Sequence, residues 1–224
     1  MNKRAAITGV TGAVGMALLE KCIREGYEVL AICRRGSTRN SRIPSSPGIT
    51  VLETDLSELD LVILPDDKPC ETFYHLAWSG TFGEDRNDLQ MQVHNIEGTL
   101  GAVRLAKRLG CRTFVGAGSQ AEYGRTKEIL RPDTPVFPES GYGMAKLCAG
   151  QMSRIACEQF GMHHIWVRLF SIYGPYDREQ TMVCASLRKM LCQKETRYTP
   201  GEQLWDFLYS ADAADALFRI GQHP

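Results

Sequence analysis

The stretch Arg4-Ala5-Ala6-Ile7-Thr8-Gly9-Val10-Thr11-Gly12-Ala13-Val14-Gly15 decides the fold of this chain. Its first five residues form a short, mainly apolar run that is typical of a buried strand. Three glycines follow at intervals of three residues, and a helical pattern begins directly after them and continues to Ile23. A strand, a glycine turn and a helix in this order predict a phosphate-binding unit.

Each glycine has a separate task in such a turn. Gly9 can make the tight turn, Gly12 lets backbone N–H groups approach a pyrophosphate, and Gly15 allows the helix to pack closely on the strand. The helix N-terminus adds partial positive charge for the anion. We therefore expect a dinucleotide cofactor here, with Thr11 and Val14 lining the same site.

Strand-like and helical segments alternate along the rest of the chain. The expected helices span residues 88–109, 142–160 and 182–191, and further expected strands span 27–33, 49–53, 72–77, 112–116 and 164–170. This alternation predicts an α/β fold with a Rossmann-type, doubly wound parallel sheet. We assign residues 1–175 to the NAD(P)-binding domain that this alternation predicts.

Two arginines, Arg34 and Arg35, follow the expected strand 27–33. In dinucleotide folds this position meets the adenosine ribose, where a carboxylate binds the 2′-hydroxyl and an arginine suits a 2′-phosphate. Because no acid follows the strand, the sequence favours NADP(H), while NAD(H) is possible. The alternative is that both arginines solvate a loop, since Arg39 and Arg42 continue its basic character.

Other residues near strand ends and in the long helix are expected to complete the cofactor site. Asp55 is placed to meet the adenine edge, although it could equally cap a helix that starts at Ser57. Asn95 interrupts an apolar helix face and is expected to hydrogen bond neighbouring backbone. These residues are Asp55, Leu56, Leu76, Ala77, Asn95 and Phe170.

Tyr142 and Lys146 stand four residues apart, which places both side chains on one face of a helix. A phenol has a reference pKa of about 10, so it is a poor base at neutral pH. An ammonium within hydrogen-bonding distance favours the phenolate and lowers that pKa. The simpler interpretation is an ordinary surface pair, and only the surrounding motifs argue against it.

Composition narrows the class of protein. The 224-residue chain is 43% hydrophobic and 23% charged, enough apolar content for a full core. Lys+Arg and Asp+Glu balance at 26 each, so neither nucleic acid nor an acidic surface is an expected partner. No apolar run reaches membrane length and no signal pattern opens the chain, so we expect a cytoplasmic protein. The scattered cysteines lack metal spacing, and we assign no metal.

Together these motifs resemble those of the extended short-chain dehydrogenases/reductases, in the NAD-dependent epimerase/dehydratase group that modifies nucleotide-activated sugars. The match covers most of the chain. It comprises the T-G-x-x-G-x-x-G turn from Thr8, the Y-x-x-x-K pair Tyr142 and Lys146, His75-Leu76-Ala77, Asn95-Ile96-Glu97-Gly98-Thr99, the run from Arg168 to Pro175, and Asp206-Phe207-Leu208-Tyr209 with Asp212.

The resemblance implies a catalytic set. Tyr142 would be the acid/base on a sugar oxygen, Lys146 would lower its pKa and hold the nicotinamide ribose, and Ser119 would hydrogen bond the reacting oxygen. Ser119 could otherwise be a simple turn residue. The group further suggests a homodimer formed through the segments 88–109 and 142–160.

Departures from the group narrow the reaction. Its 4,6-dehydratases follow the catalytic Ser/Thr with Asp-Glu, whereas Gln120 and Ala121 follow Ser119 here and cannot remove water; Glu122 would have to be re-aimed. Redox at one carbon remains, by a reductase or by an epimerase. The run from Gly118 to Gly124 and the pair Arg34-Arg35 resemble the 4-keto-6-deoxyhexose reductases more than the epimerases. The resemblance thus implies reduction of a 4-keto-(6-deoxy)hexose, with a nucleotide-sugar 4-epimerase that retains NAD as the alternative. A non-catalytic NADP-binding sensor or scaffold is a further alternative.

The expected substrate lobe is small. Members of the group usually carry about a hundred C-terminal residues for sugar binding, and only 176–203 offer such material here. Residues 176–203 are therefore expected to form a partial substrate-binding segment, and 204–224 to return to the first domain. Either the protein is a shortened member or the sequence is part of a longer one.

Overall fold

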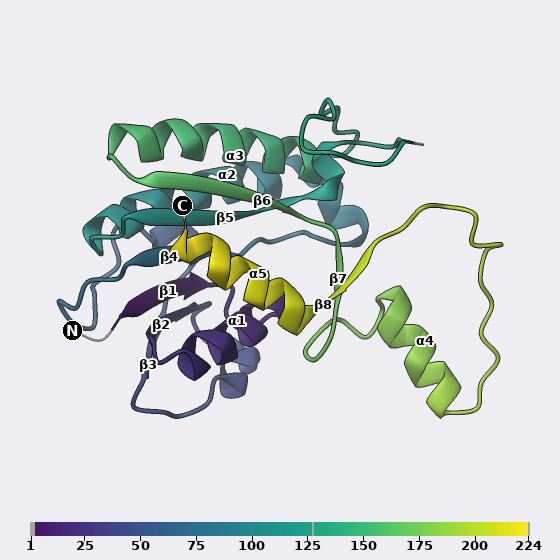
Figure 1. The fold of residues 1–224 in the computed structure, drawn as a ribbon, viewed down its shortest axis with the longest axis horizontal. Helices are drawn as coiled ribbons and strands as arrows, with labels where there is room; N and C mark the ends of the chain where they lie inside the picture. Colours follow the sequence, from purple (N-terminus) through teal and green to yellow (C-terminus); the bar gives the residue numbers. More distant parts are fainter. Residues whose placement is uncertain (1–2, 127, 224) are drawn as a thin grey trace.

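The computed structural model describes residues 3–126 and 128–223. Six strands form one parallel sheet in the order β3-β2-β1-β4-β5-β6 (Figure 1). This order belongs to doubly wound dinucleotide folds, in which the strand order reverses between β1 and β4. The predicted Rossmann-type fold is therefore confirmed. The strands are β1 (Arg4–Thr8), β2 (Glu28–Cys33), β3 (Ile49–Glu53), β4 (Thr72–His75), β5 (Thr113–Ser119) and β6 (His163–Leu169).

Helices cover both faces of this sheet. The pair α1 (Ala13–Arg24) and α5 (Ser210–Gln222) lies against one face, and α2 (Leu89–Arg108) packs with α3 (Gly141–Gln159) against the other (Figure 1). Short 3-10 turns lie in the connections: η1 (Thr38–Arg42), η2 (Leu56–Glu58), η3 (Gly83–Asn87) and η4 (Gln120–Glu122).

Two apolar cores follow from the alternation of side chains along the buried strands. On β1, Ala5 and Ile7 pack toward α1 and α5, whereas Ala6 packs toward α2. Both directions are apolar because a parallel sheet is covered on both faces. The sheet is thus rigidly held, and its strand ends can present polar groups at fixed positions.

Most element boundaries lie within one residue of the sequence-based expectation, and the larger differences are at β4, at β5 and after Asp55. β4 ends at His75 because the N–H groups of Leu76 and Ala77 turn to the Thr8 hydroxyl, at 3.2 and 3.3 Å. β5 continues to Ser119, which pairs with Leu169 of β6. The helix expected from Ser57 is only the short turn η2.

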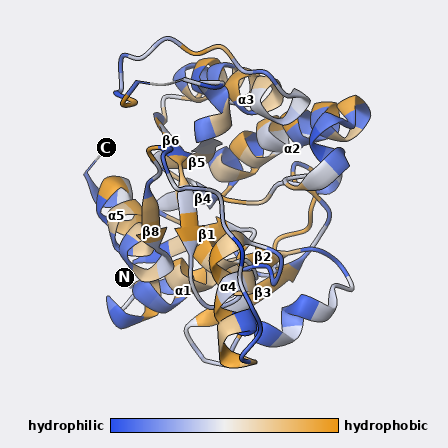
Figure 2. Cartoon of the chain, turned by 90° about the vertical axis from the view of Figure 1, so that its right-hand side faces the viewer, coloured by the Kyte–Doolittle hydropathy of each residue, from blue (hydrophilic) through white to orange (hydrophobic). Residues whose placement is uncertain are grey.

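The segment after β6 is more exposed than the main sheet, although β7 (Ser171–Tyr173) and β8 (Phe207–Tyr209) contact α5. A small parallel sheet joins β7 to β8, and α4 (Met182–Leu191) lies beside the main body with none of its residues buried (Figures 1 and 2). Across the residues described, no helix combines the length and apolar character that crossing a membrane requires.

A buried histidine ties the centre of the sheet to α2. His75 Nδ1 lies 2.9 Å from the Thr8 hydroxyl and its Nε2 lies 3.2 Å from the Thr99 hydroxyl, which donates to the Asn95 carbonyl. Burial lowers the pKa of His75 to about 3. The ring is therefore neutral in the folded protein at physiological pH and links β1, β4 and α2.

This burial makes stability depend on pH. The unfolded chain protonates His75 below about pH 6.5, while the folded chain does so only near pH 3, so acid favours the unfolded state between these values. The expected loss is about 1.4 kcal/mol for each pH unit below 6. Urea unfolding of the wild type and His75→Gln at pH 7, 6 and 5 measures it: the wild type should lose more stability than the variant, and parallel losses would contradict the assignment.

Candidate active site

The glycine turn lies where β1 and β4 end side by side. Gly9 has a φ of +69°, and a Cβ there would lie 2.7 Å from the Ala77 backbone nitrogen. A Cβ on Gly15 would lie 2.3 Å from the Gly9 carbonyl oxygen. Both glycines are therefore required by close backbone contacts, as the sequence predicted.

The N-terminus of α1 is open to an anion. Gly12 is its N-cap, no side chain caps the helix, and no acid lies in its first turn, which holds Val14. Free N–H groups and the helix dipole favour a phosphate at such an end. Arg42 of η1 adds a cation, because its guanidinium donates to the Thr11 carbonyl at 2.9 Å. These residues fit the pyrophosphate of a dinucleotide, and Arg42 was missing from the sequence-based set.

The ribose corner, which is the region after β2 where the adenosine ribose is expected, contains Ser79, Glu53 and Glu58 beside Arg34 and Arg35. Arg34 donates to the Ser79 hydroxyl at 3.1 Å, whereas Arg35 forms an ion pair with Glu58 at 2.6 Å. An acid also stands here: Glu53 pairs in register with Cys33, and its carboxylate accepts from Gly36 N and Asn40 Nδ2. Those hydrogen bonds lower the pKa of Glu53. A 2′-phosphate would thus meet Arg34 more readily than Arg35.

Asp55 and Leu56, which the sequence also assigned to the cofactor site, lie at the start of η2, whereas Asn95 lies in α2. Asp55 precedes η2 without a side-chain capping bond, so its carboxylate is not used as a helix cap, and Leu56 packs against Gly98 of α2. Asn95 is buried and makes two 2.9 Å bonds to the Ser79 backbone, which confirms the expected backbone contact. Asn95 therefore shapes the loop after β4.

Ser119 and Tyr142 come together at the end of β5. Ser119 is the last residue of that strand, and Tyr142 lies in the first turn of α3. Hydrogen bonding to the Ser119 hydroxyl lowers the pKa of Tyr142, although burial is the larger effect and raises that pKa above its ordinary value. The two side chains therefore meet at the end of β5.

Lys146 lies one turn along α3, with its ammonium 5.9 Å from the centroid of the Tyr142 ring. Its ammonium donates to the Ala117 carbonyl at 2.6 Å and lies 3.7 Å from the centroid of the Trp78 ring. Arg86 also lowers the pKa of Tyr142, and its guanidinium carbon lies 4.5 Å from the phenol centroid. The expected lowering of the Tyr142 pKa by Lys146 stays a prediction.

Burial also changes Lys146 itself. Desolvation lowers its pKa to about 7, and the nearby Glu122 carboxylate opposes part of this effect. The lysine can consequently exchange its proton near neutral pH. Neither Trp78 nor Arg86 belonged to the expected site; the signal that could have found them is their place in the loop after β4, at the end of a central strand.

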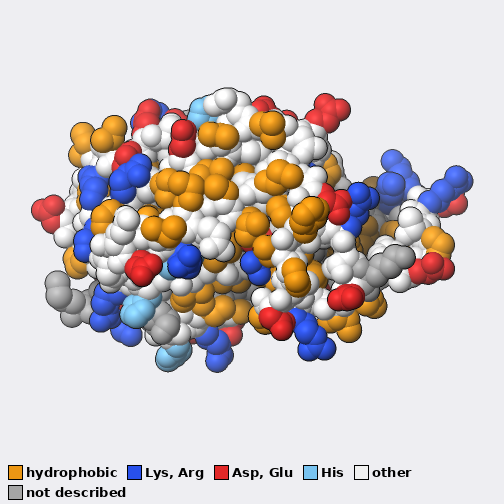
Figure 3. Space-filling model, turned by 90° about the horizontal axis from the view of Figure 1, so that it is seen from above, with side chains coloured by type: hydrophobic (Ala, Val, Ile, Leu, Met, Phe, Trp, Pro, Cys, Tyr) orange, Lys and Arg blue, Asp and Glu red, His pale blue; other side chains and the backbone are white. Residues whose placement is uncertain are grey.

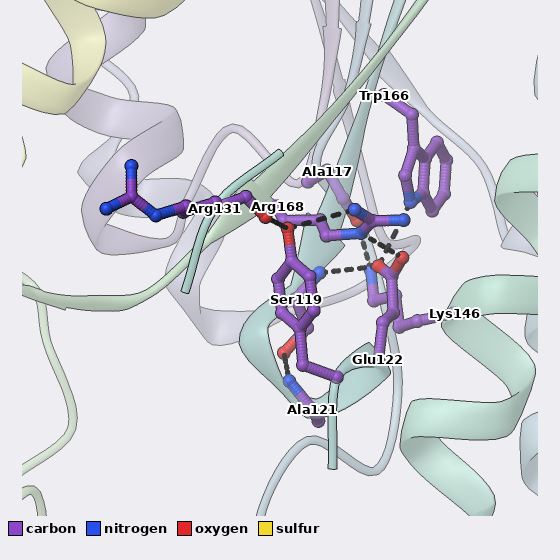
Figure 4. Close-up of polar contacts among 9 residues, drawn as sticks. Ala117, Ser119, Ala121, Glu122, Arg131, Lys146, Trp166 and Arg168 are labelled. Atoms are coloured by element: carbon purple, nitrogen blue, oxygen red, sulfur yellow. Dashed lines mark hydrogen bonds and ion pairs between the residues drawn. The ribbon is translucent and has the colours of Figure 1, made fainter. Parts of the chain in front are cut away.

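A buried ion pair supports the catalytic segment (Figure 4). Glu122 accepts from Ser119 N at 2.7 Å, from Trp166 Nε1 at 3.0 Å and from Arg168 Nε at 2.9 Å. Arg168 in turn donates to the Tyr123 hydroxyl at 3.0 Å, and the Tyr123 ring contacts Phe170. The Glu122 carboxylate is therefore committed to holding the β5 end and is not free to act on a substrate.

Alanine substitutions in the glycine turn should separate folding from binding. Gly15→Ala places a Cβ against backbone atoms that cannot move aside, so we expect a loss of about 1–3 kcal/mol in the free energy of unfolding. Gly12→Ala meets its nearest atom at 3.5 Å and should leave folding almost unchanged. Its methyl group would instead stand in the path of the anion and weaken dinucleotide binding about tenfold.

Thermal unfolding and dinucleotide titration of both variants provide the measurement. If Gly12→Ala binds dinucleotide as tightly as the wild type, the anion site at the start of α1 is wrongly assigned.

Comparison with solved structures matches the fold along nearly the whole chain. A UDP-N-acetylglucosamine 4-epimerase from Methanobrevibacter ruminantium, in complex with UDP-N-acetylmuramic acid, superposes with a TM-score of 0.86 at 21% identity, covering 99% of this chain and 73% of that one. A UDP-glucuronic acid 4-epimerase from Bacillus cereus, in complex with UDP-glucuronic acid and NAD, superposes with a TM-score of 0.78 at 22% identity, covering 97% and 72%.

Sequence comparison reaches the level of the family. A GDP-mannose 4,6-dehydratase from Vibrio cholerae is 30% identical over 211 residues, which cover 85% of this chain and 55% of that protein. The family model for the NAD dependent epimerase/dehydratase family matches residues 5–224. The chain has the Rossmann-type sheet, the glycine turn and the residues Ser119, Tyr142 and Lys146. It therefore belongs to the NAD dependent epimerase/dehydratase family of short-chain dehydrogenase/reductase enzymes.

Proposed function

We propose that this protein is an NAD(P)-dependent oxidoreductase that acts at one carbon of a nucleotide-activated sugar. The observation that carries the proposal is the meeting of Ser119, Tyr142 and Lys146 beside the glycine turn, at the carboxyl edge of the sheet. The names of the relatives, which are nucleotide-sugar epimerases and dehydratases, support the substrate class.

The positions of Tyr142, Ser119 and Arg86 suggest a separate role for each residue in the reaction. The bound nicotinamide would supply or accept the hydride. In the reductive direction, Tyr142 gives its phenolic proton to the carbonyl oxygen of the sugar as that oxygen gains negative charge, and Ser119 donates a hydrogen bond to the same atom. Tyr142 then recovers a proton from solvent. Arg86 stabilises the transient phenolate, since it faces the ring at 4.5 Å.

Reduction of a 4-keto-(6-deoxy)hexose is the reaction we favour within this class. Loss of water would need an acid and a base next to Ser119, but Gln120 and Ala121 are neither, and the Glu122 carboxylate is held by Ser119 N, Trp166 and Arg168. Redox at a single carbon therefore remains. A nucleotide-sugar 4-epimerase with retained NAD is the second candidate, because the structural neighbours described above are 4-epimerases.

For the cofactor we propose a preference for NADP(H). Arg34 is exposed, and its one described side-chain contact is the Ser79 hydroxyl, so its guanidinium can reach a 2′-phosphate. The neighbour from Bacillus cereus contains NAD, so NAD(H) is the competing cofactor. Glu53 does not decide the question, because its oxygens already accept from Gly36 and Asn40.

We further propose a homodimer formed through α2 and α3. Seen from above these helices, hydrophobic side chains gather on the outer face (Figure 3). Large exposed apolar residues of this face are Leu89, Val93, Met144, Met152 and Ile155. Covering such a patch removes apolar area from water.

The Tyr142→Phe variant tests the chemistry. It keeps the ring that contacts Trp78 and Arg86 but removes the proton, so turnover should fall about 10²–10⁴-fold while cofactor affinity stays close to wild type. The assay follows NADPH absorbance with 4-keto sugars carried on UDP, dTDP, GDP and CDP, beside an epimerisation assay on the parent sugars. Tyr198→Phe is the control because Tyr198 is exposed. Unchanged turnover in Tyr142→Phe would refute the mechanism.

Replacing Arg34 and Arg35 with alanine tests the cofactor preference. Losing a charge-assisted contact to a 2′-phosphate should weaken NADPH binding roughly tenfold or more, with little change for NADH. Calorimetric titration of both nucleotides gives the comparison, and Arg39→Ala is the matched control from the same exposed loop. Equal losses for NADPH and NADH would reject the 2′-phosphate assignment.

A further inference from the structure

The indole of Trp78 lies against both residues of the Y-x-x-x-K motif. Its ring centroid is 3.7 Å from the Lys146 ammonium, and its plane stands at 90° to the Tyr142 ring with the centroids 6.2 Å apart. Trp166 also faces Lys146 but is farther away, at 5.9 Å. Trp78 is therefore the aromatic side chain in closest contact with the ammonium.

Two residues of α2, Gln92 and Asn95, hold the Trp78 indole and its loop in place by hydrogen bonds. The indole Nε1 donates to Gln92 Oε1 at 2.9 Å. Gln92 is buried, and its amide donates to the carbonyls of Gly80 and Asp85 at 3.0 and 3.1 Å. One turn further along α2, Asn95 holds the backbone of Ser79, the residue after Trp78. Two buried amides thus hold the loop that carries the indole.

The ammonium needs such support because it is buried. Its one described hydrogen bond goes to the Ala117 carbonyl, and burial disfavours its charged form. Among the described residues, the titratable groups that interact with it are Glu122 from η4, Tyr142 from its own helix and His75 from β4. Arg86 from η3 lies against Tyr142, and Arg168 from β6 pairs with Glu122. Of these described groups only Glu122 supplies negative charge, and that charge is shared with Arg168.

We propose that Trp78 is a positioning residue of this site, which holds the Lys146 ammonium charged and directed at the Ala117 carbonyl beside Tyr142. An aromatic face attracts a cation most strongly when the pair is shielded from water, and indole is the best of the side-chain rings. The buried pair Gln92 and Asn95 is thereby explained as the anchor of Trp78. The catalytic consequence rests on the proposed function, whereas the contact itself does not.

The test is a nuclear magnetic resonance titration of the lysine side chains in the full chain, with ¹³C at Cε and no substrate or cofactor. The Lys146 signal is identified by its loss in Lys146→Arg. In the wild type it should titrate near pH 7, well below the exposed lysines. Trp78→Leu keeps an apolar side chain but removes the aromatic face, so the midpoint should fall by roughly one pH unit.

Two further variants separate the loss of the aromatic face at position 78 from a general effect of removing a tryptophan. Trp78→Phe keeps a weaker aromatic face and should shift the midpoint less, in the same direction. Trp205→Leu removes an exposed indole and should leave it unchanged. If Trp78→Leu is poorly folded, Gln92→Leu, which frees the indole from its anchor, should also lower the midpoint.

A Lys146 midpoint that is identical in the wild type, Trp78→Leu and Trp78→Phe would overturn the proposal. A shift without any nicotinamide nucleotide binding would support the Trp78–Lys146 contact and reject the proposed reaction, so the two failures are distinguishable.

Discussion

The close backbone contact between Gly9 and Ala77 is the constraint on which the site depends. It joins the carboxyl ends of β1 and β4, where the strand order of the sheet reverses. A side chain at position 9 would clash with backbone atoms, and its positive φ would also be strained. Because this contact is made by glycine, α1 begins next to the loop after β4, and an anion site lies beside the residues that carry the proton chemistry.

Burial of charge shapes the catalytic part of the site. Glu122, Lys146 and His75 are all buried, and each is held differently: Glu122 by an ion pair with Arg168, Lys146 by a carbonyl and an indole face, and His75 by two hydroxyls while it stays neutral. A buried polar group needs such partners, because losing a partner leaves the cost of removing the group from water uncompensated. The surrounding structure therefore fixes Ser119, Tyr142 and Lys146 in place.

The sequence alone predicted the parallel sheet, the glycine turn and the neighbourhood of Ser119 and Tyr142, since these follow from local patterns and strand ends. It missed Glu53 at the ribose corner, because only the register between β2 and β3 brings that carboxylate beside Cys33. It also missed the partners of Lys146: helical spacing places the side chain on the correct face, but the Ala117 carbonyl and Trp78, which contact the ammonium, come from other elements. Such tertiary contacts leave no local periodicity.

The most direct test of the dinucleotide site is to denature the purified protein, identify any released nucleotide, and then titrate the emptied chain with NADPH and NADH. We expect at least one nicotinamide nucleotide to bind in a 1:1 ratio. A diffusible reductant with a preference for NADPH would indicate the reductase, and retained NAD in stoichiometric amount would move the 4-epimerase ahead. A folded chain that neither releases nor binds a nicotinamide nucleotide would contradict the central claim.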